Sequence, residues 1–595
     1  MADEKIAKPK ASEEAEKEDK GAKGLTAEEI AKEFKEHSVA EFFKKNMQML
    51  GLTGKIKTLT TIVHEYVTNS LDACEESKIL PDIEVQLKEM ADEYYEVTVK
   101  DNGPGLTKET VGKALGKLLA GTKFHRMVQM RGQQGIGASG CTMLSQITTG
   151  KAVQVITGTG KGKPISLDLT IDPKTNEPKM ANVQELAKEF NGTIIRAKFK
   201  GVKYVNSEQA PLEYLRRTAI ANPHAQITLI EPSGEKVVFK RTYKEIPTRP
   251  VEMKPHPKGV KVDELSTLAK YSAERKVSSF LKNNFDRFGD KAVEDIAKNV
   301  SFDINKDPRQ LTWEEAEEIV NQFKKITFIA PRTDGLIPIG EPQIRKSLET
   351  IVKPEFISVV TRKPSVYSGG FPFQVEVGIA YGGNAGRMGE TSEEGQQQRK
   401  IEIMRFANRA PLLFDTGGCA TTKAVQSIDW KRYGMKDFEN APLTIFVNLI
   451  SVHIPYTGAG KQAISDEDEI MEELRLALMD TGRKIYTFIG HQRRQAEKEA
   501  KRRMYYKYAT EVAIAVAELT HKNKKEIEEK LHALVLKHLK MEEQKEKQEA
   551  AKGEMSEEEI EKEYEKRMEK EKKEKGKKAA KKGGKKTASE ETEEE

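Results

Sequence analysis

The stretch Glu65-Tyr66-Val67-Thr68-Asn69-Ser70-Leu71-Asp72-Ala73 divides into two faces when it is placed on a helix. At about 100° per residue, the apolar positions of this region gather on one side; they are Leu59, Ile62, Val63 and Tyr66, with Ser70 among them. Glu65, Asn69 and Asp72 fall on the opposite side, at spacing i, i+4 and i+7. A helix that buries its first face therefore presents a carboxylate, an amide and a second carboxylate in one polar row.

This polar row suits the hydrolysis of a phosphoanhydride. Glu65 can orient and deprotonate a water molecule, and Asn69 can offer a neutral oxygen to a Mg²⁺ ion that bridges phosphates. Taken alone, the row also fits a helix face that is simply solvated. The prediction of nucleotide hydrolysis therefore depends on the segments that accompany it.

A second motif, Asp101-Asn102-Gly103-Pro104-Gly105, follows a predicted strand in which Tyr95, Val97 and Val99 alternate. A buried Asp101 at the end of that strand can accept a hydrogen bond from an adenine amino group. Gly103 and Gly105 permit a tight loop and let a flat ligand approach the backbone. The same run also fits an ordinary turn.

The third motif is the glycine-rich run Gly132-Gln133-Gln134-Gly135-Ile136-Gly137-Ala138-Ser139-Gly140. Its successive backbone N–H groups lead into a predicted helix from Cys141 to Ser145 and form a nest for phosphate oxygens. Thr122 and Lys123 lie shortly before it and can reach the same phosphates. Residues 124–131 are predicted to form a flexible lid, and a plain linker is the alternative for the whole run.

A distant segment, Thr457-Gly458-Ala459-Gly460-Lys461, is only superficially similar to a P-loop. Pro455 takes the place of the first glycine, and Gln462 replaces the Ser or Thr that would bind Mg²⁺. Lys461 is predicted to lie on a loop after a strand at residues 443–454. From there it can reach the terminal phosphate of a nucleotide held by the first domain.

The length of 595 residues indicates about four domains. A net charge of +6 is too small for this length to predict nucleic-acid binding. Cys74, Cys141 and Cys419 match no metal-binding spacing, which favours reduced thiols inside the cell. With no apolar run of about 18 residues and no apolar segment behind the charged N-terminus, we expect a cytoplasmic protein.

The chain is predicted to begin with a disordered charged segment at residues 1–24 and to continue with a domain of helices and strands at 25–247. That domain opens with an amphipathic helix, which is either an ordinary helix or a strap across a dimer. A helical insert is expected at 248–310, and a βα domain at 311–480, where residues 373–381 alternate with period two. Helices follow at 481–540, and residues 541–595 form a charged low-complexity tail.

Four segments resemble, in order, the four motifs of the GHKL ATPases: the helix with Glu65 and Asn69, the Asp101–Gly105 run, the glycine-rich run at 132–140, and Gly192-Thr193. The resemblance implies an α+β multidomain chain whose first domain is a Bergerat α/β sandwich that binds ATP and Mg²⁺. It also implies that Glu65 is the general base, that Asn69 binds Mg²⁺ and that Asp101 reads the adenine. The other implied ATP-binding residues are Gly103, Gly105, Thr122, Lys123, Gly132, Gln133, Gln134, Gly135, Ile136, Gly137, Ala138, Ser139, Thr193 and Lys461.

The order of the later units narrows this resemblance. The insert with His256-Pro257-Lys258-Gly259-Val260 resembles a helix-two-turns-helix (H2TH) domain, and residues 311–480 are similar to a ribosomal S5-like transducer domain, with Lys461 as its switch lysine. Residues 40–46 resemble an N-terminal strap. Over residues 25–500, this arrangement is similar to the B subunits of archaeal type IIB DNA topoisomerases, the topoisomerase VI family.

That family resemblance implies a set of partners and an activity. Two B subunits dimerise when ATP binds and act as a gate around double-stranded DNA, and two A subunits make the transient double-strand break, which gives an A2B2 heterotetramer. The assembly relaxes positive and negative supercoils, associates with the nucleoid and needs no membrane. Cleavage is expected in the A subunit, docked on the helices after residue 480.

Three alternatives remain open from the sequence. They are an Hsp90-like chaperone, a MutL-like repair protein and a DNA clamp that binds ATP without hydrolysing it. The H2TH-like insert argues against the first two, because neither class carries one at this place. Glu65 argues against the third, because a scaffold has no need of a base there.

Overall fold

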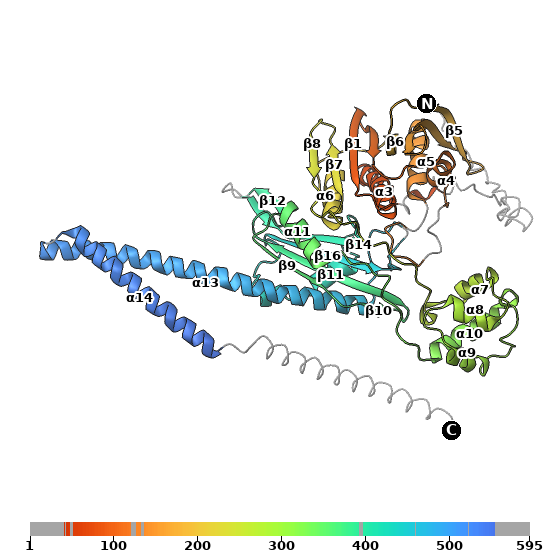
Figure 1. Cartoon of the computed structure of the whole chain (residues 1–595). Coiled ribbons are helices and arrows are strands. Elements are labelled where there is room, and N and C mark those ends of the chain that lie inside the picture. Colours follow the sequence, from red (N-terminus) through yellow and green to blue (C-terminus); the bar gives the residue numbers. More distant parts are fainter. Residues whose placement is uncertain are drawn as a thin grey trace, which may run out of the picture. The chain divides into compact units, whose positions relative to one another are not determined.

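The computed structural model describes residues 51–120, 127–132, 136–391, 397–458, 460–521 and 523–553, with residues 41, 43 and 45–47. The charged segment predicted at 1–24, most of the tail predicted at 541–595 and most of the strap lie outside the described residues; residues 541–553 of the predicted tail are helical. The chain divides into two compact units, Met1–Phe488 and Ile489–Glu595 (Figure 1).

The first domain is built on a mixed sheet of eight strands in the order β5-β4-β3-β6-β2-β1-β7-β8. All neighbours in this sheet are antiparallel except β1 and β7. The strands are β1 (Asp82–Ala91), β2 (Tyr94–Lys100), β3 (Val153–Thr159), β4 (Ile165–Ile171), β5 (Pro178–Glu185), β6 (Asn191–Lys200), β7 (Gln226–Ile230) and β8 (Lys236–Phe239).

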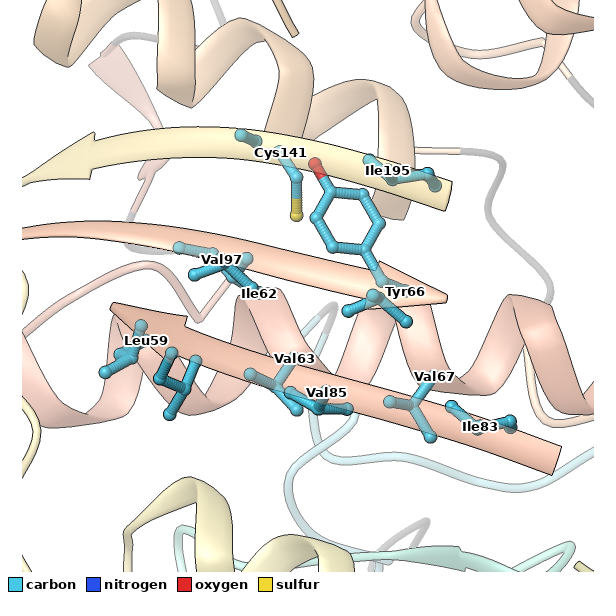
Figure 2. Close-up of a cluster of buried hydrophobic side chains, with 14 of the residues drawn as sticks. Leu59, Ile62, Val63, Tyr66, Val67, Ile83, Val85, Val97, Cys141 and Ile195 are labelled. Atoms are coloured by element: carbon cyan, nitrogen blue, oxygen red, sulfur yellow. The ribbon is translucent and has the colours of Figure 1, made fainter. Parts of the chain in front are cut away.

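Three helices pack on this sheet because each carries an apolar stripe. They are α3 (Lys55–Glu76), α5 (Gly137–Thr149) and α6 (Pro211–Ala221), and α3 contacts both of the others. Figure 2 shows Leu59, Ile62 and Tyr66 of α3 packed between strands and helices of this core. A shorter helix, α4 (Lys108–Leu115), begins at the capping hydroxyl of Thr107, which accepts a hydrogen bond from the Thr110 N–H. The predicted α/β sandwich is confirmed.

A helical unit follows the first domain. It contains α7 (Val262–Lys270), α8 (Val277–Asn284), α9 (Asp290–Ala297) and α10 (Trp313–Lys325). Its core is aromatic: the rings of Phe285 and Phe323 meet edge to face with centroids 5.5 Å apart. This core extends to Phe323, so α10 packs with the insert although residues from 311 onward were predicted to form the next domain.

The second sheet has six strands in the order β10-β11-β16-β14-β15, with β9 also paired to β11. Strand β16 is buried along its whole length, including its polar residues Thr444, Asn448 and Ser451. Helices α11 (Glu341–Ile351) and α12 (Ala420–Gln426) belong to this domain. The strands are β9 (Phe356–Thr361), β10 (Ser365–Tyr367), β11 (Phe371–Tyr381), β14 (Glu402–Ala407), β15 (Ala410–Pro411) and β16 (Leu443–Ser451), with a separate pair β12 (Arg387–Thr391) and β13 (Gln397–Lys400).

The domain built on the second sheet, called the second domain or the transducer domain below, packs directly on the first domain. Leu413 and Phe414, which follow β15, belong to the same buried cluster as α3. The Lys57 ammonium lies 4.8 Å from the centroid of the Phe414 ring. The start of α3 therefore packs against a loop of the second domain.

Two long helices end the described chain: α13 (Asp468–Thr520) and α14 (Lys524–Gly553). The first part of α13 packs on the second sheet, where Phe488 stacks on Phe356. In the second unit, the rest of α13 and α14 run antiparallel, since Lys501 pairs with Glu542 and Thr510 donates to Glu528. Of the helices in the described ranges, none has the length and apolar character needed to cross a membrane.

Candidate functional site

The polar row of α3 lies where the helical spacing placed it. Tyr66 and Val67 are buried in the core, whereas Glu65 and Asp72 are partly exposed and Asn69 is exposed. Because the apolar face of α3 packs on the sheet, the row faces away from the core. The carboxylate and amide predicted for chemistry are thus accessible to a ligand.

Glu65 meets the N-terminus of α5. A Cβ atom built on Gly137 would lie 1.7 Å from Glu65 Oε2, so only a glycine lets the carboxylate approach the first turn of α5. Backbone N–H groups and the positive end of the helix dipole gather at such a turn, which favours anions. Ile136 offers no side-chain cap to these N–H groups. The turn can therefore hold phosphate oxygens within reach of Glu65.

The glycine-rich run is described in part. Gly137, Ala138 and Ser139 form the first turn of α5, and the Ser139 hydroxyl donates to the Ile136 carbonyl at 3.2 Å. Gly132 has open space around its Cα, since an added Cβ would meet nothing within 4 Å. The other predicted phosphate-binding residues, Thr122, Lys123, Gln133, Gln134 and Gly135, lie outside the described residues.

Asp101 is held rigidly at the end of β2. Its Oδ1 accepts hydrogen bonds from the N–H groups of Gly103 (2.9 Å) and Thr193 (3.1 Å), and its Oδ2 accepts from the Ser70 hydroxyl (2.8 Å). Burial raises the pKa of the Asp101 carboxyl, and these three donors oppose the rise. Oδ2 has one hydroxyl partner, so it retains capacity to accept from a ligand.

Two glycines near Asp101 are required by backbone packing. Gly192 has φ of +121°, and a Cβ there would lie 2.1 Å from the Asp101 carbonyl oxygen, so Gly192 brings Thr193 close enough to bind Asp101. Gly105 has φ of +69°, and its Cβ would lie 2.2 Å from the Gly158 carbonyl oxygen. Gly105 has the positive φ predicted for this loop and also packs against β3; its contact with a ligand stays a prediction. Gly103 does not have a positive φ and bonds Asp101 instead.

Lys461 belongs to a loop that touches the first domain. A Cβ on Gly51 would lie 3.2 Å from the Gln462 amide nitrogen, so the neighbouring residue lies at the foot of α3. Burial lowers the pKa of His64, and the charges of Glu65 and Lys461 act on it in opposite directions. A lysine of the second domain therefore lies within electrostatic reach of the residue next to Glu65.

Arg131 is a residue of this site that no sequence motif indicated. Its guanidinium is buried and donates to Asp72 (2.6 Å), Glu75 (2.6 Å) and Asn222 (2.5 Å). Although burial opposes the shift, the carboxylates of Glu75 and Asp72 raise the pKa of Arg131. Asp72, predicted to be part of the polar row, is thus committed to Arg131.

The lid predicted at residues 124–131 is correspondingly wrong for its described half, because Val128, Gln129 and Arg131 are buried. No helical or strand periodicity in the sequence indicates that these residues are buried. The partners of Arg131 on α3 are 56 and 59 residues away in the sequence.

Two family models match the chain. One, described as histidine kinase-, DNA gyrase B- and HSP90-like ATPase, matches residues 54–173. The other, described as the transducer of the topoisomerase VI B subunit, matches residues 331–502. The first match covers α3, Asp101 and the glycine-rich run, and the second covers the sheet that carries the Lys461 loop.

Curated relatives match over most of the chain. The B subunit of type 2 DNA topoisomerase 6 from Pyrococcus abyssi is 47% identical over 566 residues, which covers 87% of this chain and 98% of the relative. The corresponding protein from Thermococcus kodakarensis is 46% identical and covers 84% and 95%, respectively. That from Methanothermobacter thermautotrophicus is 47% identical and covers 82% and 92%.

Proposed function

The chain belongs to the family of type 2 DNA topoisomerase 6 B subunits, and we propose that its first domain hydrolyses ATP at Glu65 to drive the passage of one DNA duplex through another. The α+β architecture and the family predicted from the sequence are confirmed. The observation that carries the proposed chemistry is the contact between Glu65 and the N-terminal turn of α5.

In this proposal, separate groups bind the phosphates, bind the adenine and activate the water. The N–H groups at the start of α5 hold phosphate oxygens, and Asp101, fixed by three donors, accepts from the adenine amino group. Glu65 orients a water molecule and takes its proton as the water attacks the terminal phosphate. A Mg²⁺ ion, when bound, would neutralise charge on the phosphates, and the exposed Asn69 amide oxygen fits it as a neutral ligand.

Lys461 links the nucleotide to the second domain. A lysine that binds the terminal phosphate stabilises the arrangement in which the two domains are closed, and it loses that contact after hydrolysis. ATP then favours closure because the closed form binds it more tightly. Two such chains, joined through equivalent surfaces, form a two-fold gate around DNA.

DNA and the cleavage subunit have candidate surfaces outside the pocket. The helical insert and its approach expose basic side chains that suit sequence-independent phosphate contacts; they are Lys254, Lys258, Lys261, Lys270, Arg275 and Lys276. The hairpin of the second unit exposes Met504, Tyr508, Val512 and Leu519 of α13, which fall within about 80° of helix surface at 100° per residue. An apolar stripe of this kind fits an A subunit in an A2B2 assembly.

The test is ATP turnover of the full chain, alone and with the A subunit and DNA, for Glu65→Gln against the original sequence. Glutamine keeps the size of the side chain but cannot accept a proton, so we expect turnover to fall by about 10²- to 10⁴-fold. Binding of a nonhydrolysable ATP analogue should persist. Glu76→Gln, an exposed residue at the end of the same helix, is the matched control and should leave turnover unchanged.

Equal turnover by Glu65→Gln and the original chain would contradict the role of Glu65 as base. Analogue binding without turnover in the original chain would favour a clamp that does not hydrolyse ATP. This chain without its A subunit should relax no supercoiled plasmid, since strand cleavage is proposed to reside in the partner.

A further inference from the structure

The segment Met127–Arg131, which leads into the glycine-rich loop, is attached to the second domain at three places. The Gln129 amide donates to the Ile337 carbonyl at 3.0 Å and accepts from the Ile337 N–H at 2.6 Å. The Asn408 amide donates to the Met130 carbonyl at 3.0 Å. Met127 packs on the cluster that contains Ile450 of β16 and Val452.

The same segment is attached to the catalytic helix by Arg131. The side chain of Arg131 is 6% exposed and bridges Asp72 and Glu75, which follow Asn69 on α3. The bridge is closed by Asn222 at the end of α6, whose own amide donates to the Arg409 carbonyl of the second domain at 3.2 Å. Buried charge-assisted hydrogen bonds of this kind fix their partners more firmly than surface pairs do.

These contacts join three elements that the proposed reaction requires: the start of the phosphate loop, helix α3 and the transducer domain. The residue after Arg131 is Gly132, the first residue of the proposed phosphate loop, so both attachments lie directly before the start of that loop. Gln129 lies 208 residues from Ile337 in the sequence, and its two bonds imitate the pairing of a strand with its neighbour. Side-chain amides that bond both groups of one residue permit little sliding.

We propose that Gln129 is a positioning residue for the ATPase reaction: it ties the start of the phosphate loop to the transducer domain, while Arg131 ties it to the catalytic helix. This inference rests on the proposed ATPase function. The connection differs from that proposed for Lys461, because it consists of protein–protein hydrogen bonds and involves no terminal phosphate. The nucleotide pocket is then joined to the transducer domain by two routes, one through Lys461 and the ligand and one through the chain itself.

The experiment compares Gln129→Leu with Gln374→Leu in the full chain. Leucine is close to glutamine in size but makes neither bond to Ile337. Gln374 is a similarly buried glutamine of β11 whose amide donates to the Arg362 carbonyl at 2.8 Å within the transducer domain, so its loss leaves the pocket untouched. Gln129→Glu, which keeps the acceptor for the Ile337 N–H and loses the donor, should fall between the original chain and Gln129→Leu.

Four quantities are measured for each variant: the Kd for a nonhydrolysable ATP analogue, the KM and kcat of ATP turnover, and the change in distance between the two domains when the analogue binds. The distance is followed with labels on cysteines placed at Lys151 and Lys363, which are exposed, whereas the natural cysteines are buried. For Gln129→Leu we expect the distance change to fall by about half or more and kcat by about tenfold, with Kd and KM within about threefold. Gln374→Leu should match the original chain within about twofold.

A Gln129→Leu variant with the distance change and kcat of the original chain would overturn the proposal. If Gln129→Leu does not fold, Gln129→Glu decides by the same two quantities. Failure of the original chain to bind the analogue would instead contradict the ATPase function on which the proposal rests. The two failures are therefore distinguishable in one data set.

Discussion

Asp101 in the first domain and Glu376 in the second are buried carboxylates with nearly the same surroundings. Asp101 accepts from two backbone N–H groups and a hydroxyl, and Glu376 accepts from the N–H groups of Ile339 and Gly340 and from the Asn448 amide. Burial raises the pKa of both.

The two carboxylates differ in position. Asp101 directly follows β2 at the proposed nucleotide site, while Glu376 lies in the middle of β11 and binds the two N–H groups that precede α11. A buried, well-bonded carboxylate is therefore not a functional signal by itself, and its place relative to a ligand site decides its role.

The first prediction to sharpen this comparison is Asp101→Asn, with the largest expected effect. Asn keeps an oxygen for the two backbone donors, and the Ser70 hydroxyl can turn to accept from the new NH₂ group. The acceptor for the adenine amino group is lost, so ATP should bind about 10- to 100-fold more weakly with little change in the melting temperature. Calorimetric titration with an ATP analogue measures this, and unchanged affinity would place adenine elsewhere.

The matching substitution in the second domain is Glu376→Gln. The donors around Glu376, which include the Thr361 hydroxyl at 3.5 Å, use both carboxylate oxygens, so an NH₂ group in place of either oxygen faces a backbone N–H. We expect the free energy of unfolding to fall by about 1–3 kcal/mol while nucleotide affinity is unchanged. Denaturant unfolding of the two variants side by side checks it, and a stability loss for Asp101→Asn as large as that for Glu376→Gln would break the distinction.

The smallest expected effect concerns acid stability and the Arg131 cluster. Burial lowers the pKa of His224, although its 2.7 Å contact with Glu75 opposes the shift. As the pH falls through about 6.5, the unfolded chain gains a proton that the folded chain does not, so stability is lost. The pKa of Glu75 is lowered, so its contribution is lost only at lower pH than this window.

The measurement is the free energy of unfolding of the original chain and of His224→Gln between pH 7.5 and 5.5. Over that range the free energy of unfolding of the original chain should fall by about 1 kcal/mol more than that of the variant. His491→Gln, an exposed histidine of α13, serves as the control and should behave like the original chain. An identical pH dependence for His224→Gln would mean that folding leaves the pKa of His224 unchanged, which would contradict this prediction.

The sequence predicted those parts of the site that repeat with a local period. Helical spacing placed Glu65 and Asn69 on the polar side of α3, and strand alternation placed Asp101 at the end of β2. What it did not predict depends on contacts between distant segments. Nothing in the residues around Arg131 indicates that the guanidinium is buried against α3, and nothing around Gly105 indicates its close approach to Gly158, which is remote in the sequence.

The most direct test of the account is a structure of the chain with Mg²⁺ and a nonhydrolysable ATP analogue. We expect phosphate oxygens at about 3 Å from the N–H groups that begin α5, with the Asn69 amide oxygen on Mg²⁺, Asp101 on the adenine and Lys461 on the terminal phosphate. A nucleotide bound with Asn69 and Lys461 both remote from it would contradict the account.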